Sequence, residues 1–335
     1  MNNPYSLLPI QLGKGQVLLT PVKTAPQPAI ELQSVARPAV DSSRKLTLLK
    51  RTGFFGADLR GCTIERACEA ADLRAAYQLV HNVFVGTGYI KPEKGGIRLR
   101  IFEATADTAT FVAKKDGVVV GVLSVVPDTA ELGLPSDTAF KEELDSLRAT
   151  GARLCEITNQ AVTKEFRSSS VLTELMRCAI AYMIQAGYDR ALATVSPNHK
   201  NFYNLVGFQS LGSLRSYSDK LHDPVVAIFL SIDLYRSAEP AEGIDPAVHR
   251  HAATANPFLA SATDWTRRAR QRFLSTDVLS NLLVTGRNFL SECTPAELSY
   301  LRKSWGANLF DQIMDRPTIS DAKADDAPAH ACLAA

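Results

Sequence analysis

The sequence predicts an α/β fold built on a mixed sheet in its middle region, residues 61–236. One sign is the dense alternation of strand and helix patterns there. Another is the pair of apolar runs 110–114 and 118–126, because the Asp116-Gly117 step between them is a strong hairpin signal. A third is the stretch 171–186, whose apolar residues recur at helical spacing. Hairpins mixed with crossover helices imply a mixed sheet in an α/β or α+β arrangement.

Each element of this region has its own pattern. In chain order we expect a strand over 62–67, a helix over 70–85, strands over 110–114 and 118–126, a helix over 137–149, a strand over 153–162, a helix over 171–186, a strand over 189–195, a helix over 197–206, and closing strands over 208–215 and 225–234. The helix that starts at Pro197 has Ser196 as its N-cap, and proline suits the first helical position.

Two flanking regions differ in composition from the middle. Residues 1–60 are rich in Pro, Ser, Thr and Gln, which predicts a flexible extension. Residues 237–335 predict a helical extension with a disordered tail. Within it, Thr294-Pro295-Ala296-Glu297 is a capping box that predicts a helix to about residue 308. A further helix is expected over 265–289, and its start is rich in arginine. This helix either packs on the middle region or makes peripheral contact with anionic lipid.

Composition limits the classes of function. The chain has 335 residues, of which 46% are hydrophobic and 21% charged, as in an ordinary globular enzyme. Its net charge of +2 is too small to indicate nucleic-acid binding. The six cysteines form no Cys-x-x-Cys pair, so we expect no metal site and a cytoplasmic setting. We also expect no signal peptide and no membrane-spanning helix.

The motif Tyr203-x-x-x-Gly207-Phe208 follows the strand-like run 191–195. It resembles the helix and strand that close the acyl-thioester site of GNAT acyltransferases. Other pieces between about Arg66 and Tyr235 resemble the N-acyl amino acid synthases, a GNAT-like family related to the acyl-homoserine-lactone synthases. They include Gly88-Tyr89-Ile90, Ile97-Arg98-Leu99-Arg100, Thr110-Phe111-Val112-Ala113, Leu123-Ser124-Val125-Val126-Pro127-Asp128, Gly133-Leu134-Pro135, Glu156-Ile157-Thr158 and Pro197-Asn198-His199.

This resemblance implies a GNAT-like fold and transfer of a long-chain fatty acyl group to the α-amine of an amino acid. The implied donor is an acyl carrier protein thioester, so the co-substrate is an acyl-phosphopantetheine thioester and no bound cofactor is expected. Glu156 is the candidate base, because a carboxylate inside the apolar run Leu154-Cys155-Glu156-Ile157 is costly to bury unless it is paired or functional. The alternatives are that Glu156 forms a structural ion pair with an arginine, or that it lies on the exposed face of an edge strand.

Tyr203 is the candidate proton donor to the leaving thiolate, or else it orients the thioester; a packed tyrosine is the alternative. Arg98 and Arg100 point the same way in an extended segment, so one of them can bind the carboxylate of the amino acid; a pair of solvated arginines is the alternative. Asn198 either bonds the pantetheine amides or caps its own helix. His81 and His199 are more typical of structural histidines than of proton relays.

The expected pantetheine-binding loop departs from the GNAT pattern. Coenzyme A enzymes usually carry a glycine-containing loop after the central strand, and here both glycines are missing from residues 163–170. Arg167 with Ser168, Ser169 and Ser170 can still hold one phosphate at a helix N-terminus, or the serines only cap the helix. This favours a carrier-protein donor over coenzyme A. An acidic carrier suits a basic docking face, for which Lys164, Arg167, Arg177 and Lys200 are candidates.

Several alternatives stay open. The acyl chain needs an apolar tunnel, and Phe111, Leu123, Val125, Leu154 and Met176 either line it or form the core. A homoserine-lactone synthase is disfavoured, because the N-terminal region has no tryptophan: the only two are Trp265 and Trp305. An acetyl-coenzyme A N-acetyltransferase and a non-catalytic GNAT-like sensor of acyl ligands are the other two readings.

Overall fold

A computed structural model describes residues 5–12, 16–23, 42–263 (except 52, 57, 94, 106, 168, 217–223 and 243), 265, 278–279, 281–283 and 287–315. The chain divides into two compact units, residues 1–41 and residues 42–335. The first contains an antiparallel hairpin of β1 (Tyr5–Leu12) and β2 (Gln16–Lys23). The second contains the candidate site.

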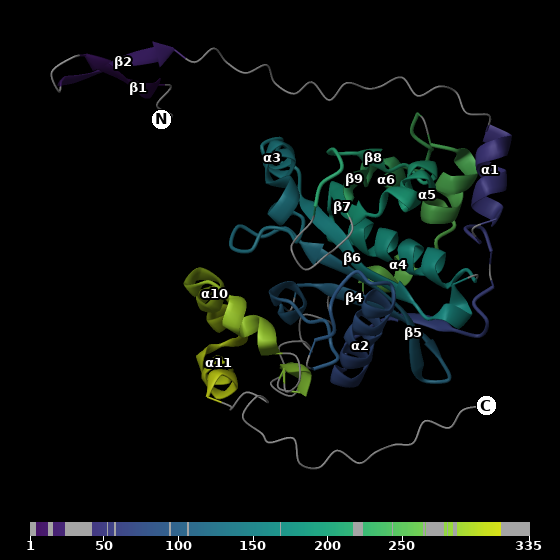
Figure 1. Ribbon diagram of the computed structural model, residues 1–335. Coiled ribbons are helices and arrows are strands. Elements are labelled where there is room, and N and C mark those ends of the chain that lie inside the picture. The colour runs from purple at the N-terminus through teal and green to yellow at the C-terminus, as the bar shows by residue number, and fades with distance from the viewer. Residues whose placement is uncertain are drawn as a thin grey trace. The chain divides into compact units, whose positions relative to one another are not determined.

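The second unit follows the predicted order of strands and helices through its middle region (Figure 1). Its elements are α1 (Ser42–Arg51), β3 (Thr63–Arg66), α2 (Ala70–Gly86), η1 (Ile101–Ala104), β4 (Ala109–Lys115), β5 (Val118–Pro127), α3 (Asp137–Arg148), β6 (Leu154–Val162), η2 (Lys164–Phe166), α4 (Val171–Ala186), β7 (Arg190–Val195), η3 (Pro197–His199), α5 (Lys200–Leu205), β8 (Gln209–Ser210), β9 (Val226–Ser231), α6 (Asp233–Arg236), α7 (Pro246–His249), η4 (Arg250–Thr254), η5 (Arg287–Glu292), α10 (Pro295–Trp305) and α11 (Ala307–Met314).

Seven strands form one mixed sheet in the order β3-β4-β5-β6-β7-β9-β8. Its pairs are antiparallel except β6 with β7, which run parallel. The α/β fold with a mixed sheet is therefore confirmed. Its hairpin turns at Asp116 and Gly117, which have φ of 51° and 80°. Those positive angles explain why this dipeptide joins the two strands.

The parallel pair opens into a wedge. The register of β6 and β7 covers only Leu154 to Glu156 against Arg190 to Leu192. Beyond that point β7 stays paired with β9, and β6 stays paired with β5. β6 also carries a bulge at Asn159, where φ is 55° and the register with β5 shifts. A bulge bends a strand and redirects its side chains. The bulge at Asn159 comes just after Glu156, where β6 separates from β7, so it lies at the wedge.

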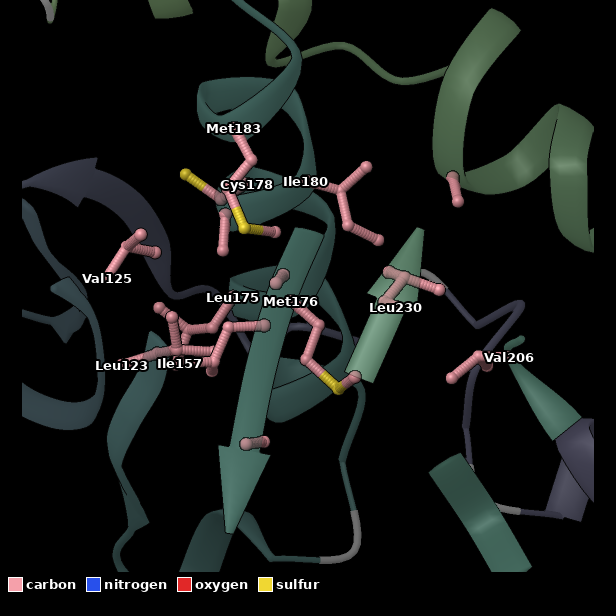
Figure 2. Close-up of a cluster of buried hydrophobic side chains, with 14 of the residues drawn as sticks. Leu123, Val125, Ile157, Leu175, Met176, Cys178, Ile180, Met183, Val206 and Leu230 are labelled. Atoms are coloured by element: carbon pink, nitrogen blue, oxygen red, sulfur yellow. The ribbon is translucent and has the colours of Figure 1, made fainter. Parts of the chain in front are cut away.

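One face of the sheet is covered by α4. Leu175, Met176 and Cys178 of this helix pack against Leu123 and Ile157 in one hydrophobic cluster, as Figure 2 shows. All of the residues suggested for an acyl tunnel are buried core rather than cavity wall: Phe111, Leu123, Val125, Leu154 and Met176. Their burial supplies much of the hydrophobic free energy that holds helix and sheet together.

The other face carries α2 over β4 to β6, and α3 over the later strands. Val122 packs with α2, whereas its neighbour Leu123 packs with α4, because successive strand residues point to opposite faces. The C-terminal helices extend the α2 cluster, since Leu301 and Trp305 of α10 are buried in it. In Figure 1, α10 and α11 lie next to one another in the yellow part of the chain.

Several local predictions can be compared with the structure. The capping box is confirmed: Thr294 Oγ1 accepts from the Glu297 N–H, and a Glu297 carboxylate oxygen accepts from the Thr294 N–H. The predicted strand 208–215 is shorter, with two residues in β8 and one further bridge from Arg215 to Val225. Its middle is diverted over α3, where Arg215 pairs with Glu143.

The flanks contribute more ordered structure than their composition indicates. Within the predicted flexible extension, α1 is helical, and Leu49 and Phe54 are buried with the α4 cluster. Most of the helix expected over 265–289 lies outside the described residues. The boundaries of the three predicted parts therefore stay a prediction. Among the helices described, none is long and apolar enough to cross a membrane.

Candidate active site

A cavity of about 1170 Å³ opens at the wedge between β6 and β7. Several parts of the chain form its wall, among them Pro135 and Thr138 at the start of α3. The larger contributions come from the end of α2 through η1 (Phe84, Tyr89, Ile90, Arg98, Arg100, Phe102), the outer half of β6 (Ile157, Thr158, Asn159, Gln160), the end of β7 with α5 (Ala193, Val195, Ser196, His199, Phe202, Tyr203), and the start of α4 (Arg167, Ser169, Leu172, Thr173). A further stretch comes from the C-terminal extension: Phe289, Glu292, Cys293 and Glu297.

Glu156 lies on β6 just before the strands separate. Its side chain is 1% exposed, and its Oε2 accepts a 2.9 Å hydrogen bond from the Ser136 N–H at the start of α3. Burial raises the pKa of Glu156 to about 7, although the hydrogen bonds from Ser136 and the charge of Arg100 oppose the rise. The carboxylate is not itself in the cavity wall, but Pro135, Ile157 and Thr158 beside it are. A group that titrates near neutrality suits general-base work.

Tyr203 projects from α5 into the same cavity. The ring is 5% exposed and meets Phe202 and Phe208 edge-on, at centroid distances of 5.5 and 5.2 Å. Its hydroxyl donates a hydrogen bond to Oε1 of Gln160 on β6. Burial raises the pKa of Tyr203 to about 12, so the phenol keeps its proton near neutral pH. The structure thus brings Tyr203 to the wedge, as the sequence analysis expected.

Arg98 and Arg100 both line the cavity, and Glu103 connects them to the sheet. Arg100 donates to Glu103 through its side chain and, at 2.8 Å, through its backbone N–H. Arg98 Nη1 donates to Asn159 Oδ1 at 2.8 Å. Asn159 Nδ2 in turn donates to Glu103 Oε1 at 3.0 Å. The side chains of two arginines, one carboxylate and one amide therefore form a connected network along one wall.

The Glu103 carboxylate is fully buried, with no exposed area. Burial by itself would raise its pKa, but the Arg100 guanidinium, together with Arg98 and Asn159, lowers it below the usual value. Arg100 is consequently held by a carboxylate. The Arg98 guanidinium donates to the Asn159 amide and lies over the Phe84 ring, 5.3 Å from its centroid.

The proposed phosphate loop is shaped largely by its own hydrogen bonds. Ser169 lines the cavity, and its Oγ donates to Phe166 O and accepts from the Val171 N–H. Ser170 is buried and outside the wall, and its N–H donates to Asp58 O at 3.0 Å. Arg167 is exposed at the cavity edge. Ser168 lies outside the described residues.

A short N-terminal stretch packs against this loop. Thr173 Oγ1 donates to Gly53 O, and Arg60 donates to Glu165 O. A Cβ on Gly56 would come within 2.5 Å of Ser170 Oγ. We call residues 53–56 and 58–60 the brace. Its contacts connect it to η2 and to the start of α4.

The remaining candidates lie in different places. Asn198 is exposed and absent from the cavity wall, whereas His199 is part of it. His81 Nε2 accepts from the Glu93 N–H at 3.0 Å, which is a structural role. Arg177 was expected on a docking face, but this is wrong: it is 8% exposed, pairs with Glu174 and donates to His251 O and Ala255 O.

Three site residues escaped the sequence analysis. Glu103 sits in a short η1 helix with no periodic signal, although a lone acidic residue three positions after Arg100 hinted at a local pair. Asn159 and Gln160 follow Glu156 on β6, where a run of polar residues in an otherwise apolar strand marked the change of environment. No local pattern predicted that Phe289, Glu292, Cys293 and Glu297, the C-terminal wall, line the cavity. Among the described residues, no group of metal-binding side chains is large enough for a metal site.

Comparison with known proteins identifies one family model that covers part of the chain around this site. Residues 75–231 match the family model described as N-acyl amino acid synthase FeeM. The resemblance to the N-acyl amino acid synthases is confirmed. The FeeM-like segment, residues 75–231, contains Arg98, Glu103, Glu156 and Tyr203, and the match supports N-acyl transfer as the reaction class. The brace and the C-terminal wall lie outside this segment.

Solved structures give weaker likenesses. FeeM from uncultured soil microbes has 24% sequence identity, a TM-score of 0.46, and covers 51% of this chain and 91% of its own. The acyl-homoserine-lactone synthase LasI has 16% identity and a TM-score of 0.41, covering 51% of this chain and 89% of its own. A putative N-acetyltransferase from Lactobacillus plantarum has 16% identity and a TM-score of 0.39, covering 51% of this chain and 99% of its own. No curated protein sequence matches this chain.

Proposed function

We propose that this protein transfers a long-chain fatty acyl group from an acyl carrier protein thioester to the α-amine of an amino acid. The observation that carries the proposal is the cavity at the wedge, which is lined by the Tyr203 phenol, by Arg98 and by many apolar side chains. Its volume of about 1170 Å³ is large for a lone amino acid and suits an acceptor together with an acyl chain.

The arginine wall is the proposed site for the carboxylate of the amino acid. A guanidinium presents two parallel N–H donors that match a carboxylate. Arg98 is the better candidate of the two, because Arg100 is already held by Glu103. Asn159 orients Arg98 by accepting a hydrogen bond from its guanidinium, and the β-bulge fixes the position of Asn159.

The proposed reaction uses Glu156 and Tyr203 on opposite sides of the wedge. The ammonium of the amino acid loses one proton to Glu156, through a bound water because the carboxylate lies just behind the wall. The amine nitrogen then forms the C–N bond, and the C–S bond breaks with its electron pair on sulfur. Tyr203 gives its proton to the thiolate and regains one from the nitrogen. The products are an N-acyl amino acid and a free thiol.

The start of α4 supports a carrier-protein donor. A helix N-terminus binds phosphate through N–H groups that have no partner within the helix. Here the Ser170 and Val171 N–H groups already donate to Asp58 O and to Ser169 Oγ. The site is thus poorly suited to the diphosphate of coenzyme A, and the single phosphate of a carrier-bound pantetheine is the easier match. Exposed Lys164 and Arg167 lie nearby for an acidic carrier.

The test uses purified protein, carrier proteins charged with acyl chains of different length, and the twenty amino acids. We expect mass spectrometry to detect an N-acyl amino acid together with release of free thiol. Replacing the carrier-bound donors by acyl-coenzyme A of the same length should lower kcat/KM by at least about 10-fold, which corresponds to roughly 1.4 kcal/mol. Equal use of both donors would refute the carrier assignment and leave the transferase assignment standing.

Two outcomes would favour the alternatives. Turnover of acetyl-coenzyme A, with no long-chain product, would indicate an N-acetyltransferase. Saturable binding of acyl-pantetheine with no product from any donor would indicate a sensor. The cytoplasmic setting and any peripheral membrane contact stay predictions.

A further inference from the structure

Gln160 has an unusual place in the cavity wall. Its Oε1 accepts from the Tyr203 hydroxyl, while its Nε2 is buried and has no hydrogen-bond partner among the described residues. A buried amide N–H without a partner costs roughly 1 to 3 kcal/mol, so such a group calls for an explanation. Because Gln160 lines the cavity, a bound ligand is the natural acceptor.

The fold aims this amide across the wedge. The bulge at Asn159 sends the Asn159 side chain toward Glu103 and Ser124, whereas Gln160 reaches in the other direction to Tyr203. Gln160 belongs to β6, and Tyr203 belongs to the helix that follows β7. The hydrogen bond between them therefore spans the two diverging strands at the place where a thioester would enter.

The pair also has a defined orientation. With the phenol donating to Oε1, the amide turns its N–H groups away from the ring. The raised pKa of Tyr203 keeps the phenol protonated and able to hold this arrangement. Packing against Phe202 and Phe208 fixes the position of the Tyr203 ring, and so of its hydroxyl oxygen, beside Gln160.

We propose that Gln160 Nε2 donates a hydrogen bond to the carbonyl oxygen of the acyl thioester and stabilises the oxyanion that forms when the amine attacks. This inference rests on the proposed acyl transfer. The C–N bond forms as the carbonyl electron pair moves onto oxygen, where the amide N–H meets it; the pair returns as the C–S bond breaks. Tyr203 holds the amide through its hydrogen bond before the reaction, and it gives its proton to the sulfur as the C–S bond breaks.

The kinetic test replaces Gln160 by methionine, which has a similar length and no donor. Loss of one oxyanion donor is expected to lower kcat by about 10² to 10³, with little change in the KM of either substrate. Gln78→Met is the matched control, because Gln78 is exposed on α2, and it should leave kcat unchanged. A Gln160→Met variant with near wild-type kcat would overturn the inference. So would a loss that is matched by a lower unfolding temperature.

A spectroscopic test works without turnover. S-acyl-pantetheine with a ¹³C-labelled carbonyl is bound to Glu156→Gln and to Glu156→Gln/Gln160→Met, and infrared difference spectra are recorded. A hydrogen bond from Nε2 lowers the carbonyl stretching frequency in the first protein, and the shift should be absent in the second. Equal frequencies would reject Gln160 as the donor, even if acyl transfer is proved. A shift that depends on Gln160, combined with no product from the wild-type protein and any donor, would keep the donor role and reject the transferase.

Discussion

The backbone N–H of Ser136 donates a hydrogen bond to Glu156 Oε2 at 2.9 Å, which ties the start of α3 to the candidate base on β6. The contact fixes one carboxylate oxygen in a site that is almost closed to solvent. Burial outweighs this bond and raises the pKa of Glu156 to about 7. The candidate base is thus held in place, with a pKa that lets it accept a proton near neutral pH.

Activity should follow the ionisation of Glu156. Only the carboxylate accepts a proton, so kcat/KM should rise with pH up to about 7 and level off above it. Glu156→Gln should lower kcat by about 10² to 10⁴ and remove this limb of the profile. Initial rates from pH 5.5 to 9 test this, with the exposed Glu239→Gln as control. An unchanged profile in Glu156→Gln would exclude the residue as base.

The raised pKa of Glu156 also makes the stability of the fold depend on pH. Because the folded-state pKa lies above the ordinary value of 4.5, the protonated form is favoured in the fold, and stability from this group is lost as pH rises from about 4.5 through 7. Glu156→Gln should therefore be more stable than wild type at pH 8 but not at pH 4.5. Urea unfolding at the two pH values measures the difference.

Arg98 and Arg100 should respond differently to the same substitution. Arg98→Lys keeps the charge but loses the planar pair of donors, so the KM for the amino acid should rise about 10-fold or more with little loss of stability. Arg100→Lys breaks a contact with the buried Glu103 and should mainly lower the free energy of unfolding. If instead Arg100→Lys raises the KM and Arg98→Lys does not, the assignment of the two arginines is reversed.

Trp305 should support the arginine wall from the C-terminal extension. Its indole N–H donates to Ala104 O at 2.9 Å, in the η1 turn that holds Glu103. Trp305→Ala should cost about 3 to 5 kcal/mol and raise the KM for the amino acid. Trp305→Phe keeps most of the packing and should cost about 1 kcal/mol. Denaturant unfolding and amino acid titrations test this, and full stability of Trp305→Ala would contradict it.

Gly56→Ala should displace the brace from α4. The new Cβ would lie 2.5 Å from Ser170 Oγ and 3.2 Å from Gly53 O. Because this disturbs the start of α4, we expect a higher KM for the acyl donor and an unchanged KM for the amino acid. Gly86→Ala is the control, since nothing lies within 4 Å of its added Cβ. Equal donor KM values for the two variants would show that the brace has no part in donor binding.

His251 should make the fold sensitive to acid. Burial and the nearby Arg177 lower the pKa of His251 to about 4, and its ring contacts Phe54 and Phe55. Glu174 lies 3.8 Å away but is already paired with Arg177. The neutral ring is favoured in the fold, so stability is present above the ordinary pKa of 6.5 and is lost as pH falls from 6.5 through about 4.

The loss should stay below about 3 kcal/mol, because the ring keeps some contact with solvent, which screens its charge. His251→Phe keeps an aromatic ring and cannot titrate, so the difference in unfolding free energy between it and wild type should change over this pH range. Chemical unfolding between pH 4 and 7.5 measures it. A difference that is constant with pH would mean that His251 does not titrate in the fold.

The sequence by itself determined the order of elements, the hairpin at Asp116-Gly117, the capping box at Thr294 and the place of Glu156 inside an apolar strand. Each depends on neighbours within a few positions, through periodicity, turn chemistry or an acidic residue in an apolar strand. Only the tertiary structure decided that Gln160 meets Tyr203, 43 positions away, and that Trp305 supports the turn containing Ala104, 201 positions away. Such contacts arise where strands diverge and distant helices pack, and no local pattern encodes which side chains then face one another.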